Sequence, residues 1–114
     1  MSLRRFLLPG LAVLAAALVA AGCAATGPSE PVATTKVTMV KSYRFDPEKI
    51  EIDAGQSVTW TNDDNFTHTV EVEGQGDHKV GRGESVSIRF GEPGTYDYVC
   101  TLHSHDMRGT VIVT

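Results

Sequence analysis

The sequence has no apolar run long enough to cross a membrane. A spanning helix needs about 20 consecutive apolar residues, whereas the longest wholly apolar run, residues 11–21, covers 11. Arg4 and Arg5 lie shortly before this run. A positively charged start followed by a short apolar segment is typical of a secretory signal peptide. We therefore predict that residues 1–23 direct export.

Cysteine is scarce, with only Cys23 and Cys100 in the chain. The small residues Ala20, Ala21 and Gly22 come directly before Cys23, a pattern that resembles the lipobox of bacterial lipoproteins. We predict that Cys23 is lipidated, so that the protein is anchored to the cell membrane and faces the periplasm or the exterior. Leu is commonest where Ala20 stands, and plain secretion with cleavage nearby is the alternative.

Positive charge is also in short supply. From residue 24 onward, 8 Lys and Arg stand against 14 Asp and Glu, which leaves a net charge of −6. Nucleic-acid binding requires a basic face, and electrostatic attraction to anionic lipid requires clustered Lys and Arg. Neither class of partner fits, so membrane attachment would come from the lipid alone.

Helical periodicity and internal repeats are absent. Residues 24–35 are rich in Ala, Thr, Gly, Pro and Ser and have no periodicity, which predicts a flexible tether. Residues 36–114 form one domain, in which short runs alternate apolar and polar residues between turn signals. These runs are 37–43, 48–53, 57–62, 67–73, 85–90, 95–100 and 109–114. The pattern predicts an all-β, antiparallel sandwich of about seven to eight strands.

The alternation of side chains along a strand indicates which residues point inward. His68 shares a face with Val70 and Val72, and Cys100 shares a face with Tyr96 and Tyr98. Because these neighbours are apolar, we expect His68 and Cys100 to face the core at the ends of their strands. The Asp63-Asp64 pair is predicted to be a solvated turn and His78 to lie in a solvated loop.

A group of metal-binding side chains follows Cys100. His103, His105 and Met107 lie within seven residues of it, and a lone thiol in an oxidising compartment is a liability unless it is buried or ligated. Two imidazoles, one thiolate and a weak axial thioether are the ligand set of blue copper, whereas zinc seldom uses thioether. We predict that His68, Cys100, His103 and Met107 bind one copper ion. His105 remains an alternative ligand, and a structural role in the core remains the alternative for His68, Cys100 and Met107.

Residues 98–103 and 107–111, together with Phe45-Asp46-Pro47, Trp60 and His68, closely resemble the cupredoxin family of plastocyanin- and amicyanin-like type 1 copper proteins. The resemblance implies a Greek-key sandwich and single-electron transfer between transient redox partners by a monomer. It also implies that His103 lies near the surface as the electron's port, with Leu102 and Met107 in an apolar contact patch.

The sequence departs from the family at Thr69, where many relatives have Asn, and at Leu102, where relatives often have Pro. We expect the Thr69 hydroxyl to bond across to the loop after Cys100. A copper-delivery protein without redox activity and a metal-free binding module are the alternative functions. An enzyme is not expected, because the sequence offers no second copper set and no catalytic triad.

Overall fold

The computed structural model describes residues 30–114. The predicted signal peptide, the lipidation site Cys23 and residues 24–29 of the predicted tether lie outside this range. Within the described range, no helix is long and apolar enough to cross a membrane.

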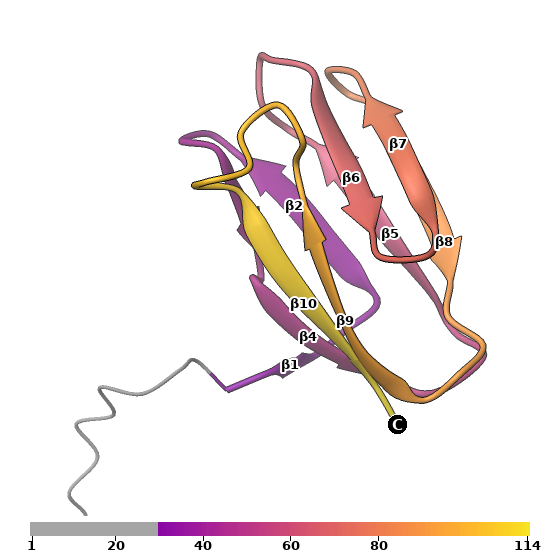
Figure 1. Ribbon diagram of the computed structural model, residues 1–114. Helices are drawn as coiled ribbons and strands as arrows, with labels where there is room; N and C mark the ends of the chain where they lie inside the picture. Colours follow the sequence, from indigo (N-terminus) through magenta and orange to yellow (C-terminus); the bar gives the residue numbers. More distant parts are fainter. Residues whose placement is uncertain (1–29) are drawn as a thin grey trace, which may run out of the picture.

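Two β-sheets face each other (Figure 1). The six-stranded sheet has the order β1-β4-β10-β9-β6-β7, with bounds β1 Val32–Ala33, β4 Lys49–Ile52, β10 Arg108–Val113, β9 Gly94–Val99, β6 His68–Val72 and β7 Gly76–Val80. The four-stranded sheet has the order β3-β2-β5-β8, with bounds β3 Arg44–Asp46, β2 Lys36–Val40, β5 Ser57–Asn62 and β8 Ser85–Arg89. The predicted all-β sandwich is confirmed.

Strand pairing is mostly antiparallel, with parallel pairs where the chain crosses between the sheets. β1 and β10 each pair with β4 in parallel, and β2 pairs with β5 in parallel. All seven predicted runs overlap a strand, and the strand predicted at 57–62 has the bounds of β5. The short strands β1 and β3 were not predicted. Neither was β7, so the expectation that His78 lies in a loop was wrong.

The core lies between the sheets and is rich in aromatic residues. Trp60, Tyr98 and Phe45 are fully buried. The Tyr98 ring makes edge contacts with Phe45 and Trp60, at centroid distances of 4.8 and 5.2 Å. Edge-to-face packing at such distances suits the charge distribution of aromatic rings. This core fixes the inner face of β9, the strand that leads directly to Cys100.

Candidate metal centre

His68 and Cys100 are brought together by neighbouring strands. His68 is the first residue of β6, and Cys100 directly follows the last residue of β9. The two strands are antiparallel neighbours, with Glu71 opposite Val99. Antiparallel pairing therefore places the start of β6 beside the end of β9. Both side chains are fully buried, which confirms the inward orientation predicted from strand alternation.

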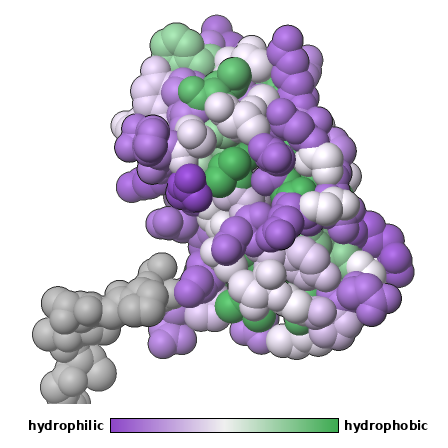
Figure 2. Space-filling view, viewed as in Figure 1, coloured by the Kyte–Doolittle hydropathy of each residue, from purple (hydrophilic) through white to green (hydrophobic). Residues whose placement is uncertain are grey.

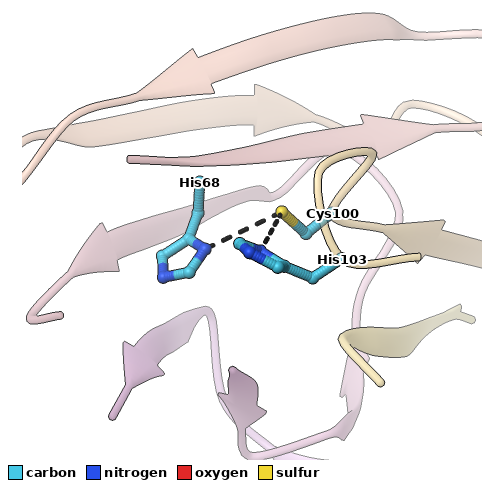
Figure 3. Close-up of side chains that lie close together, drawn as sticks. All are labelled: His68, Cys100 and His103. Carbon is cyan, nitrogen blue, oxygen red and sulfur yellow. Dashed lines mark hydrogen bonds between the residues drawn. The ribbon is translucent and has the colours of Figure 1, made fainter. Parts of the chain in front are cut away.

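Three potential ligand atoms converge at this end of the sandwich (Figure 3). The Sγ atom of Cys100 lies 3.8 Å from Nδ1 of His68 and 3.7 Å from Nδ1 of His103. All three ligand atoms lie within 4.8 Å of one another, and His103 is half-buried whereas the other two residues are buried. The group thus has one side close to the surface.

The loop between β9 and β10 is closed by backbone hydrogen bonds. The Cys100 amide donates to the Met107 carbonyl at 3.0 Å, the His103 amide to the Cys100 carbonyl at 3.1 Å, and the Met107 amide to the His103 carbonyl at 2.9 Å. Met107 is thereby held beside Cys100, and its side chain is fully buried. His105 is exposed and does not belong to the group of three.

Asp64 holds the imidazole of His68 by a hydrogen bond to the nitrogen that does not face Cys100. The Asp64 side chain is buried, and its Oδ2 accepts a hydrogen bond from His68 Nε2 at 2.8 Å. Since Nε2 donates to the carboxylate, Nδ1 of a neutral imidazole carries the lone pair that faces Cys100. The hydrogen bond from His68 lowers the pKa of Asp64, although burial opposes that shift. The prediction of a solvated turn was therefore wrong for Asp64.

Thr69, in β6, is hydrogen-bonded both to the sulfur of Cys100 and to the loop that follows Cys100. Its amide donates to Cys100 Sγ at 3.3 Å. Its Oγ1 accepts a hydrogen bond from the Thr101 amide at 2.7 Å and lies 2.7 Å from Thr101 Oγ1. The expected bond from position 69 across to the loop is therefore present.

An apolar surface surrounds the exposed side of His103. Leu102 and Phe66 are 57% and 56% exposed. The Tyr43 ring lies 5.9 Å from the Phe66 ring and 4.3 Å from the His103 ring. Figure 2 shows hydrophobic residues at the end of the molecule that carries the β9–β10 loop. We call Tyr43, Phe66 and Leu102 the apolar rim. Met107 was expected in this surface, but its complete burial excludes it.

Tyr43 could not be assigned to the site from the sequence. It has a left-handed backbone with φ of +57°, and so has Ser42, with φ of +81°. Non-glycine residues rarely adopt this conformation, and a conformation of this kind persists only where the surrounding structure holds it. The turn after β2 thus places the Tyr43 ring against His103 at some conformational cost.

The spacing of the three atoms fits a bound metal ion. Metal–nitrogen bonds of about 2.0 Å and metal–sulfur bonds of about 2.3 Å, at an angle of about 120°, place two ligand atoms about 3.7 Å apart. The observed Sγ–Nδ1 separations are 3.8 and 3.7 Å. Thiolate and imidazole, with a thioether in the same loop, suit copper best among the common metals.

The chain matches the family model described as a cupredoxin-like domain over residues 10–113. This match covers most of the chain, and the protein therefore belongs to the cupredoxin-like family.

Curated relatives and solved structures agree with this assignment. The chain is 37% identical over 106 residues to amicyanin-alpha of Methylorubrum extorquens, with 87% of each chain covered. It is 34% identical over 83 residues to plastocyanin of Scenedesmus fuscus, covering 60% of this chain and 85% of the relative. The structure of an amicyanin variant in its Cu(I) form superposes with a TM-score of 0.62 at 31% identity, covering 76% of this chain and 95% of that one.

Proposed function

We propose that the protein is a type 1 copper protein that carries single electrons between redox partner proteins. The observation that carries this proposal is the convergence of one thiol sulfur and two imidazole nitrogens within 4.8 Å in the protein itself. Similarity to amicyanin, including a structure in its Cu(I) form, supports copper as the metal.

His68, Cys100, His103 and Met107 would hold the copper ion. When bound, copper supplies a centre that accepts and releases one electron by cycling between Cu(II) and Cu(I). The protein holds the ligands in place through hydrogen bonds made by Asp64 and Thr69 and through the closed loop. Because these contacts do not depend on the metal, little of the frame needs to move when an electron arrives.

His103 would be the port through which the electron passes. It is the half-buried member of the group, and the apolar rim surrounds it. An exposed apolar surface has few polar groups to desolvate on contact, and it therefore suits brief association over a small interface. The remaining ligands are buried, so a partner would approach most closely at His103.

Copper delivery is the alternative role, and burial weighs against it. A delivery site has to present its ligands to an acceptor protein, whereas His68 and Cys100 are fully buried. An enzymatic role has little support either, because the chain spans 87% of amicyanin-alpha and so matches a relative of its own size. We propose a monomeric, non-enzymatic carrier.

Spectroscopy of the copper-loaded protein tests this function. We expect strong absorption in the red and a narrow copper hyperfine splitting in the EPR spectrum, since both depend on the thiolate–copper bond. Cys100→Ser should abolish the colour, whereas substitution of the exposed His105 by Ala should leave it intact. A colourless protein with a wide splitting would refute the electron-carrier role.

Export and anchoring complete the proposal. We infer that residues 1–23 are a signal peptide and that Cys23 is lipidated, which would hold the carrier at the outer side of the cell membrane. Metabolic labelling with a radioactive fatty acid tests this inference. Label should enter the wild-type chain and not Cys23→Ser, and unlabelled wild-type protein in the culture medium would show plain secretion instead.

A further inference from the structure

A chain of hydrogen-bonding groups leads from the surface to the sulfur of Cys100. Asp77, in β7, is exposed, and its Oδ2 accepts a hydrogen bond from the Thr101 hydroxyl at 3.3 Å. Thr101 Oγ1 lies 2.7 Å from Thr69 Oγ1, and Thr69 Oγ1 lies 3.8 Å from Cys100 Sγ. Asp77 is thus connected to the sulfur through two hydroxyl groups.

Each hydroxyl has one hydrogen, so these contacts compete. An ionised carboxylate only accepts, which assigns the Thr101 hydrogen to Asp77. The 2.7 Å contact between the two hydroxyl oxygens also needs a hydrogen, and only that of Thr69 remains. The Thr69 hydroxyl therefore points to Thr101 and away from the sulfur. Cys100 Sγ keeps a single short bond, from the Thr69 amide at 3.3 Å.

We propose that Asp77 controls how many hydrogen bonds the sulfur of Cys100 receives and so sets the reduction potential of the bound copper. Without Asp77, the Thr101 hydroxyl is free to turn toward Thr69 Oγ1 and to supply the hydrogen of that contact. The Thr69 hydroxyl is then released to donate to Sγ. Thr69, Thr101 and Asp77 are positioning residues in this scheme, which rests on the proposed copper site.

A second hydrogen bond would change the reduction potential through its effect on the charge of the sulfur. A second hydrogen bond withdraws electron density from the thiolate, which weakens its donation to Cu(II) more than to Cu(I). The reduction potential therefore rises. The same change lowers the energy of the sulfur electrons, so that the sulfur-to-copper absorption band moves to shorter wavelength.

Removal of a negative charge raises the potential by itself, and a matched control is required. Glu71 is exposed, lies directly opposite Asp77 on β6 and makes no hydrogen bond to either threonine. Glu71→Ala removes the same charge from the same face without releasing a hydroxyl. Thr101→Val provides the converse test, because it releases the Thr69 hydroxyl without changing the charge.

The experiment compares Asp77→Ala, Thr101→Val, their combination and Glu71→Ala in the copper-loaded protein. We measure the reduction potential, the position of the red absorption band and the resonance Raman shift on transfer to D₂O. We expect Asp77→Ala to raise the potential more than Glu71→Ala does. Asp77→Ala and Thr101→Val should both move the band to shorter wavelength and enlarge the deuterium shift. In the Thr101→Val background, Asp77→Ala should raise the reduction potential by no more than Glu71→Ala raises it in the wild-type protein.

Equal potentials for Asp77→Ala and Glu71→Ala, with no change of the band in Thr101→Val, would overturn the proposal. That result differs from failure of the copper site itself, in which the wild-type protein would have no red band. All three substituted positions are exposed, so the fold is expected to survive. Unfolding of each metal-free variant by urea checks that point separately.

Discussion

At the scale of single residues, Asp64 determines how His68 can act. An imidazole offers two nitrogens, and the carboxylate of Asp64 holds Nε2 at 2.8 Å, so that Nδ1 faces Cys100. The sequence did not distinguish Asp64 from its neighbour Asp63, because both lie in a polar loop without periodicity. In the structure Asp63 is exposed and Asp64 is buried, and only the fold of the loop separates them.

Asp64→Ala should destabilise the protein and weaken copper binding. Loss of the carboxylate leaves His68 Nε2 buried without a partner, which costs about 1–3 kcal/mol. Loss of a carboxylate partner of a ligand histidine typically weakens metal binding by about 10- to 100-fold. Urea unfolding and competition with a chelator measure the two effects. Asp63→Ala is the control, and equal copper affinity in both variants would contradict the role assigned to Asp64.

Met107→Leu should raise the reduction potential and preserve the blue colour. As a proposed ligand, the Met107 thioether would donate weakly to copper and favour Cu(II), whereas leucine keeps about the volume of this buried side chain without donating. His105→Ala should leave the potential nearly unchanged, since His105 is exposed and outside the ligand group. Cyclic voltammetry measures both variants. A large change in His105→Ala alone would reassign the axial ligand.

At the scale of elements, alternation predicted what lies on regular strands. The alternation of residues along the strands placed His68 and Cys100 inward, and both are fully buried. The alternation did not predict β7, because the pattern of apolar and polar residues is weak there. This strand begins at Gly76, with φ of +81°, and follows Gly74, with φ of +77°. The alternation also gave no information on the turn that carries Tyr43, because a turn has no side-chain period. The ligand types and the bond from Thr69 to the loop were therefore predictable, whereas the support from Asp64 and the contact of Tyr43 with His103 were not.

Gly109 lets β10 pack against β9, and Gly109→Ala should destabilise the sandwich. Gly109 lies opposite Tyr98. A methyl group there would collide with the Tyr98 ring and would lie 2.8 Å from the Glu48 carbonyl oxygen. Such overpacking costs about 1–3 kcal/mol, measured as a lower urea midpoint. Gly91→Ala is the matched control, because its nearest neighbour is the end of the flexible Arg89 side chain. An equal midpoint shift in both variants would count against this packing.

At the scale of the whole molecule, the net negative charge and the apolar rim would act at different stages of the proposed docking of a redox partner. The chain from residue 24 carries a net charge of −6, while Leu102 and Phe66 leave an apolar area at the metal end. Charge acts over a distance and steers a partner, whereas apolar contact acts only on docking. The net charge therefore favours partners with a positive docking face.

Salt should slow electron exchange with a cationic reactant. At an ionic strength of about 0.15 M, charges interact over roughly 8 Å, so added salt weakens the long-range attraction. Stopped-flow reduction of the copper protein by a small cationic complex measures the rate, and an anionic complex is the control. The rate should fall with salt for the cation and rise for the anion. Identical salt dependence for both reactants would show that net charge does not steer the encounter.

The closed β9–β10 loop also has a bearing on how such proteins diversify. Three of the four proposed ligands lie in the eight residues from Cys100 to Met107, and the two ends of that segment are joined by their own backbone hydrogen bond. The segment is therefore a closed loop that joins β9 to β10. A change of length between His103 and Met107 would fall within this loop, between β9 and β10 and away from His68. We therefore expect that such a change would shift the proposed ligands of the loop relative to His68 while both strands keep their pairing.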